Sequence, residues 1–88
     1  MTNWTKELKK YEMAVWEKGS TWQRARIAFR HDAMSALKLN ELREICDTVA
    51  EKNFYAEMSD DWNVTHKEKM ENNAIANAAR KELLDRVG

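Results

Sequence analysis

The chain has no proline, two glycines and one cysteine among its 88 residues. Strands joined by tight turns usually need more proline and glycine than this, so the shortage favours an all-helical chain. The one cysteine, Cys46, cannot form an internal disulfide, which predicts a reducing compartment. Gly-rich phosphate loops, Cys-x-x-Cys pairs and a His-Glu-x-x-His motif are also absent from the sequence. These absences leave no motif that points to catalysis.

Long apolar runs and an excess of one charge are missing as well. No segment has the apolar length of a signal peptide or a membrane span, so we expect a cytoplasmic protein without a membrane partner. Fifteen lysines and arginines balance 15 acidic residues. Dedicated nucleic-acid domains are usually distinctly basic overall, and this balance argues against such a domain.

The residues that usually fill a core are few, since Leu, Ile, Val and Phe together make up 15 of the 88. Eleven alanines allow helices to approach closely, and five methionines and four tryptophans can fill irregular gaps. Because the net charge is zero, the composition predicts a folded chain with a thin core rather than a disordered one. The length predicts a single helical domain over residues 1–88.

Apolar periodicity predicts a compact all-α bundle of three to four helices and no strands. The apolar face shifts near residues 38–40, which predicts a break there with Asn40 as a cap. The expected helices cover about residues 3–18, 21–38, 40–53 and 66–86. Their expected core stripes are Trp4, Leu8, Tyr11 and Val15, then Trp22, Ala25, Phe29, Ala33 and Ala36, and then Leu42, Ile45, Cys46 and Val49.

Three local signals set the expected helix ends. Gly19 follows the first helix at a position where a positive φ is common, which only glycine adopts at low cost. Ser20 stands three residues before Gln23, the spacing of a capping box that begins the second helix. Thr65 and Glu68 have the same spacing and predict the start of the fourth helix.

The stretch KGSTWQRARIAFRHD, residues 18–32, is basic over most of its length. On a helical wheel its cations form one broad face that includes two apolar residues. Arginine beside exposed apolar groups is typical of interface anchors, and arginine can also grip phosphates. The sequence therefore predicts a partner-binding face made of Arg24, Arg26, Ile27, Arg30, His31 and Met34.

The same basic face has a plainer explanation. Carboxylates cluster on the expected third helix and in the loop after it, so a basic helix beside an acidic one could be paired inside the domain or simply solvated. Nucleic-acid binding through this face is a third reading, although the neutral charge argues against it. The carboxylates concerned are Glu44, Asp47 and Glu51, with Glu57, Asp60 and Asp61.

Two tryptophans lie away from the expected core stripes. Trp16 is off the stripe of the first helix, and Trp62 stands in the acidic loop EMSDDWNV. Each could fold back onto the domain, or each could be an exposed anchor for a partner, where tryptophan is enriched. We include both among the candidate partner-binding residues.

Titratable side chains do not suggest a reaction. His31 and Asp32 are neighbours in sequence and do not face each other on a helix, and Cys46 falls in an apolar stripe as a buried, inert thiol. Asp60, Asp61 and His66 have no recognised metal-ligand spacing. We therefore expect no catalytic site, no cofactor and no metal.

In overall composition the chain resembles the short accessory proteins of bacteriophages, which are small, poor in cysteine and rich in tryptophan and charge. The resemblance rests on composition and on no particular residue. It implies a protein in the host cytoplasm that binds and blocks one host protein, such as a defence enzyme or a toxin. The sequence thus predicts a non-enzymatic inhibitor or adaptor, with a nucleic-acid-binding protein and a homo-oligomer as alternatives.

Overall fold

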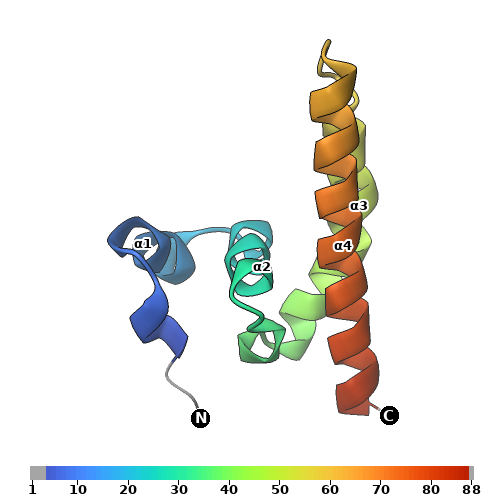
Figure 1. Cartoon of the computed structure of the whole chain (residues 1–88). Coiled ribbons are helices and arrows are strands. Elements are labelled where there is room, and N and C mark those ends of the chain that lie inside the picture. The colour runs from blue at the N-terminus through green and yellow to red at the C-terminus, as the bar shows by residue number, and fades with distance from the viewer. Residues whose placement is uncertain (1–3, 88) are drawn as a thin grey trace.

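The computed structural model describes residues 4–87, and every regular element in that range is helical. Two short 3-10 helices, η1 (Trp4–Glu7) and η2 (Met34–Ala36), precede α1 and α3. The all-α prediction is confirmed, with four α-helices and no strand among the described residues. The α-helices are α1 (Lys10–Lys18), α2 (Thr21–Arg30), α3 (Leu39–Ala56) and α4 (Trp62–Val87) (Figure 1).

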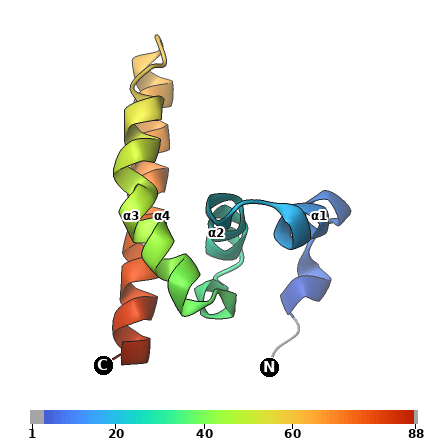
Figure 2. The same ribbon diagram turned by 180° about the vertical axis from the view of Figure 1, so that it is seen from behind.

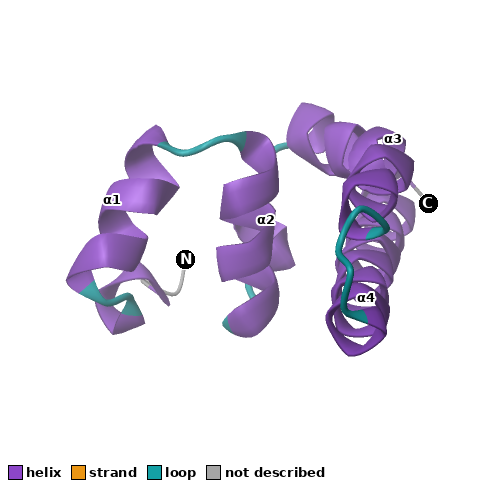
Figure 3. Ribbon diagram, turned by 90° about the horizontal axis from the view of Figure 1, so that it is seen from above, coloured by secondary structure: helices purple, strands orange, loops and turns teal. Residues whose placement is uncertain are grey.

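The longest two helices, α3 and α4, form an antiparallel hairpin, and α2 and η2 lie beside the half that is remote from its connecting loop (Figures 1 and 2). α1 lies beyond α2, so the helices stand in a row when viewed from above (Figure 3). The molecule measures 42 × 35 × 18 Å, with a radius of gyration of 13.5 Å. A compact domain of this length would have a radius near 12 Å. This flat arrangement leaves the loop end of the hairpin clear of the other helices.

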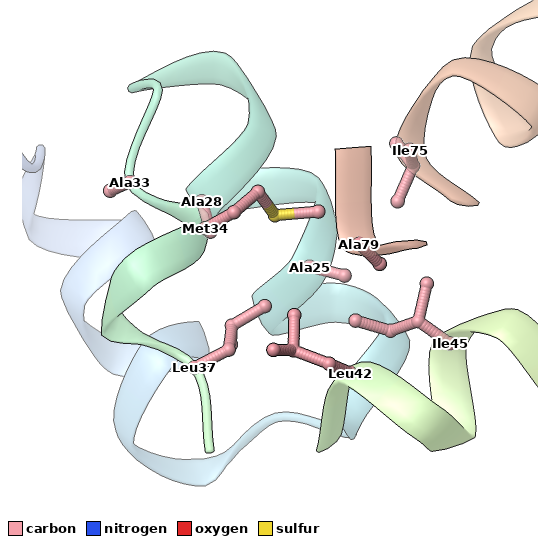
Figure 4. Close-up of a cluster of buried hydrophobic side chains, with 9 residues drawn as sticks. All are labelled: Ala25, Ala28, Ala33, Met34, Leu37, Leu42, Ile45, Ile75 and Ala79. Atoms are coloured by element: carbon pink, nitrogen blue, oxygen red, sulfur yellow. The ribbon is translucent and has the colours of Figure 1, made fainter. Parts of the chain in front are cut away.

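The core lies where α2, η2 and the hairpin meet (Figure 4). Alanines on α2 and α4 allow the backbones to approach, and Leu42 and Ile45 of α3 fill the space between them. The predicted core positions Leu42 and Ile45 are fully buried. The buried residues of the cluster are Ala25, Ala28, Ala33, Met34, Leu37, Leu42, Ile45, Ile75 and Ala79.

The first helix is shorter than its predicted range. The chain bends at Leu8, and α1 begins after Lys9, whose backbone N–H donates to the Glu12 carboxylate at 3.3 Å. Tyr11 is 61% exposed, so its predicted core position is wrong. The prediction assumed that one stripe faces a common core, whereas α1 packs mainly against α2. Residue 3 and the side chain of Trp4 lie outside those described.

Gly19 ends α1 for a different reason from the predicted one. Its φ is −78° and its ψ is 173°, so the backbone is extended and the expected positive φ is wrong. Its N–H donates to the carbonyl of Val15 at 2.6 Å, and a Cβ at this position would overlap that same oxygen. The glycine is needed because the chain passes close to the end of the helix.

The predicted capping box at the start of α2 is confirmed. The backbone N–H of Ser20 donates to the Gln23 side chain at 2.9 Å, and the N–H of Gln23 donates back to the Ser20 hydroxyl at 3.3 Å. Each residue therefore satisfies a backbone donor that the first helical turn leaves unpaired. This local signal was readable because all of its partners lie within four residues.

The end of α2 falls at Arg30 rather than at residue 38. The N–H of Ala33 donates to Ala28 at 2.7 Å and that of Asp32 donates to Phe29 at 3.3 Å, the paired bonds of a Schellman motif. Asp32 adopts a φ of 51°, the left-handed conformation that this motif requires. Aspartate stands where glycine is usual, which is why the sequence did not reveal this helix end.

The remaining boundaries also differ from the predictions. α3 begins at Leu39, where the N–H of Lys38 donates to Glu41 at 3.1 Å, so Asn40 lies inside the helix and is not its cap. α4 begins at Trp62, because the Asp61 carboxylate accepts the N–H of Asn63 at 2.9 Å. The loop expected over residues 58–64 is therefore confirmed only for residues 58–61, and the predicted capping box of Thr65 is wrong.

Candidate protein interface

The predicted arginine face does not form one exposed surface. Ile27 and Met34 are 5% and 8% exposed, so neither is available to a partner in this structure. Met34 belongs to the core cluster, whereas Ile27 lies outside it, about 200° round α2 from the core residue Ala25. α2 is buried on two sides because it stands between α1 and the hairpin (Figure 3). For the same reason Phe29, a predicted core residue, is exposed.

Arg24 joins α2 to α3. Its guanidinium contacts the Glu41 carboxylate at 2.7 Å from Nη2 and 2.8 Å from Nε, and Nη1 donates to the carbonyl of Gly19 at 2.9 Å. The two side chains keep 25% and 12% of their surface exposed. Glu41 also accepts the N–H of Lys38, so one carboxylate caps α3 and holds α2.

His31 makes a matching connection to α1. Its Nε2 lies 3.1 Å from Oε2 of Glu12, which is buried and also accepts the N–H of Lys9. The hydrogen bond from His31 lowers the pKa of the Glu12 carboxyl, followed by the Lys9 N–H and the nearby charge of Arg30, while burial opposes them. Glu12 and Glu41 are the buried acidic residues of the described chain, and they bond His31 at the end of α2 and Arg24 within α2, respectively.

The other two cations are more exposed. Arg26 lies 3.4 Å from Glu71 of α4, with both side chains open to solvent, and such pairs hold helices together only weakly. Arg30 is exposed and makes no ion pair within residues 4–87. The acidic partners of α2 are Glu12, Glu41 and Glu71, none of which the sequence had suggested for this role.

The two predicted tryptophan anchors differ in their surroundings. Trp16 packs against the core cluster and lines an open pocket of about 390 Å³ together with Arg24 and Lys38. Trp62 stands at the loop end of the hairpin and is 71% exposed. Its ring stacks on that of His66, with centroids 5.0 Å apart and planes 5° from parallel.

Exposed apolar side chains are concentrated at the end of the hairpin that carries Trp62. Single exposed apolar residues are normal on a protein surface, but a group at one place is not. Half of the ten large hydrophobic residues that are exposed in the described part of the chain fall between positions 54 and 64, at the end of α3, in the loop and in the first turn of α4. We call this group the tip cluster; it consists of Phe54, Tyr55, Met58, Trp62 and Val64.

At this end of the hairpin, where Ala56 is buried, polar side chains form hydrogen bonds and an ion pair between the two helices. Asn53 donates to Asn73 at 2.9 Å and accepts from Asn72 at 3.1 Å, and Lys69 pairs with Glu57. The Thr65 hydroxyl donates to the carbonyl of Ala56 at 3.0 Å, which satisfies the last turn of α3. Here polar side chains connect the two helices while the aromatic ones face solvent, the reverse of the arrangement in the core.

The charge at this end is acidic. Residues 51–71 contain six carboxylates and three lysines. Lys69 pairs with Glu57, and Lys52 lies 5.9 Å from the ring centre of Trp22. Glu51, Asp60 and Glu68 make no ion pair within the described part of the chain. The tip cluster is therefore bordered by carboxylates that have no ion-pair partner among residues 4–87.

A second open pocket lies in the corner between α2 and the hairpin. It measures about 310 Å³ and is bordered by Trp22, Arg26, Lys52, Tyr55 and Glu68, among others. Two cations, Arg26 and Lys52, and two carboxylates, Glu68 and Glu71, line it, so its walls favour neither sign of ligand charge. Tyr55 connects this corner to the tip cluster.

Among residues 4–87, His, Cys, Asp and Glu side chains form no group of three that could hold a metal ion. The Cys46 thiol is half-buried and lies 3.9 Å from the carbonyl of Ala76. No helix in this range combines the length and the apolar character needed to cross a bilayer.

Comparisons with protein-family models, with curated proteins and with solved structures found no match to this chain. The candidate interface therefore rests on its own geometry. Sequence reasoning identified Trp62 but missed its four apolar neighbours. One signal was available: Phe54 follows the buried Ile45 by nine positions, which places it about 180° round the same helix, away from the core.

Proposed function

We propose that this chain is a non-enzymatic interaction protein that binds another protein through the tip cluster. The observation that carries the proposal is the reversed polarity of the hairpin end. Asparagine and threonine connect the helices there, and Tyr55 and Trp62 stay in solvent at 57% and 71% exposure. Leaving such rings in water gives up burial energy that a small core needs, and a partner that covers them recovers it.

The mode of action that fits this surface is occlusion. The hairpin projects beyond α1 and α2, so its end can enter a partner while the rest of the chain remains outside (Figure 1). An inhibitor or an adaptor needs no chemistry beyond such contact. The composition typical of bacteriophage accessory proteins is in keeping with a host protein as the target.

The proposal is tested by capture from a lysate of the cells in which the protein acts, with and without nuclease. We expect one stoichiometric protein that survives nuclease and is lost with the variant Tyr55→Ala/Trp62→Ala. The matched control, Tyr11→Ala/Leu84→Ala, removes an exposed ring and an exposed apolar side chain elsewhere, at 61% and 63% exposure. Recovery that disappears with nuclease would favour nucleic acid, and equal capture by both variants would contradict a tip interface.

A further inference from the structure

We infer that the partner surface is a recess that is apolar inside and basic at its rim. This inference rests on the proposed function and adds the chemistry and the shape of what the tip cluster contacts. It follows from two features of the hairpin end, namely the distribution of the apolar side chains around it and the charge of their neighbours.

The members of the tip cluster surround the hairpin rather than occupying one face. Val64 precedes the buried Ile75 by 11 positions, which places both about 20° apart on the side of α4 that faces α2 lower down. Trp62 lies about 140° away from Ile75 on the same helix. Tyr55 borders the pocket next to Trp22, on the α2 side of the hairpin. A flat partner would cover one side only, so burying Tyr55 and Trp62 together requires a concave one.

The width of the hairpin sets the size of that recess. Two packed helices with side chains are about 20 Å across, so the recess must be at least that wide to admit the tip. The tip keeps its shape without a partner, because Asp61 caps α4 and Thr65 closes the last turn of α3. A preformed tip loses little conformational entropy on binding.

The negative charge at the hairpin end favours a recess with basic residues at its rim. Glu51, Asp60 and Glu68 lie in or beside the 54–64 segment without an ion-pair partner among the described residues. Burying carboxylates against apolar or acidic groups is costly, whereas lysine and arginine at the rim would compensate them and speed the encounter. The same carboxylates repel nucleic-acid phosphates and anionic lipid surfaces, which makes a basic protein recess the favoured occupant.

Photo-crosslinking tests both parts of the inference. Benzoylphenylalanine is placed at Tyr55 in one preparation and at Trp62 in another, with Tyr11 as the control position, and each protein is irradiated in lysate. We expect both tip positions to label the same partner, on segments rich in lysine and arginine, and Tyr11 to label it weakly. Labelling from only one tip position would contradict the recess, and labelled segments without basic residues would contradict the rim.

The remaining outcomes separate this inference from the proposed function. A crosslink to a second copy of the chain would overturn the inference and favour a homo-oligomer. Crosslinks only to nucleic acid or lipid, or no protein crosslink at either tip position, would overturn the proposed function as well.

The partner that crosslinking identifies is then purified in its free form, and its rate of association with the chain is used to test the role of the carboxylates. We expect Glu51→Gln/Asp60→Asn to slow association about three- to tenfold at low salt, with little effect at high salt. The matched control, Glu17→Gln/Asp85→Asn, removes one exposed glutamate and one exposed aspartate away from the tip. Equal association rates for the two variants would contradict a basic rim.

Discussion

The guanidinium of Arg24 lies 2.7 Å from the Glu41 carboxylate, and that carboxylate also accepts the first free N–H of α3. One ion pair therefore fixes both where α3 begins and how α2 packs on it. His31 and Glu12 repeat the arrangement at α1. The basic character of α2 is explained in large part by these connections within the chain, so the exposed side chains at the tip of the hairpin are the stronger candidates for contact with a partner.

The Arg24 pair predicts a clear difference between two arginines on one helix. Arg24→Met leaves Glu41 largely buried without its cation, and we expect the free energy of unfolding to fall by about 2 kcal/mol. Arg26→Met removes an exposed pair and should change it by less than about 0.5 kcal/mol. Urea unfolding followed by circular dichroism measures both. Equal losses for the two variants would contradict the structural role of Arg24.

Glu12 predicts an acid-dependent contribution to stability. Its pKa is lowered in the folded chain, mainly by the hydrogen bond from His31, so the carboxylate stabilises the fold above its unfolded pKa of about 4.3. That contribution is lost as the pH falls through the lower folded pKa. The stability difference between the natural chain and Glu12→Gln should therefore shrink between about pH 5 and pH 3. A difference that stays constant over this range would show that the pair contributes nothing through charge.

Asp32 predicts a stabilising substitution. Its left-handed conformation at the end of α2 is costly for residues with a side chain and natural for glycine. We expect Asp32→Gly to raise the free energy of unfolding by about 0.5–1 kcal/mol, and Asp32→Val to lower it by at least about 1 kcal/mol. Thermal unfolding of the two variants checks this, and the reverse order would mean that the Schellman motif is not formed.

The tip cluster predicts that binding and folding can be separated. Trp62→Ala should change the free energy of unfolding by less than about 0.5 kcal/mol, because the ring is 71% exposed. Leu42→Ala in the core should cost about 2–5 kcal/mol. Urea unfolding of both variants provides the measurement. A large loss for Trp62→Ala would show that the ring supports the hairpin and is not held available for a partner.

Features decided by near neighbours could be read from the sequence, and features decided by tertiary contacts could not. The Ser20 capping box and the buried Leu42 and Ile45 were predicted correctly, since both follow from spacing along one helix. The end of α2 was missed because it uses aspartate instead of glycine. The burial of Ile27 was missed because a wheel with one apolar stripe cannot describe a helix that is packed on two sides.

At the tip of the hairpin, too, the features that depend on tertiary contacts could not be predicted from the sequence. Trp62 was predicted as a candidate anchor from its residue type, but the tip cluster forms only when the end of α3 and the start of α4 are brought together. At this end the antiparallel pairing includes hydrogen bonds of Asn53 with Asn72 and Asn73, which lie 19 and 20 positions further along the sequence. Helical periodicity carries no information about contacts at that separation.

The most direct test of the tip interface is the dissociation constant for the partner that crosslinking identifies, purified without the crosslink. Calorimetry measures it for the natural chain and for two double variants. We expect Tyr55→Ala/Trp62→Ala to weaken binding at least about tenfold relative to the natural chain, as truncation of aromatic anchors does. We expect Tyr11→Ala/Leu84→Ala to change binding by less than about twofold. Equal weakening by the two variants, or none by the first, would contradict a tip interface.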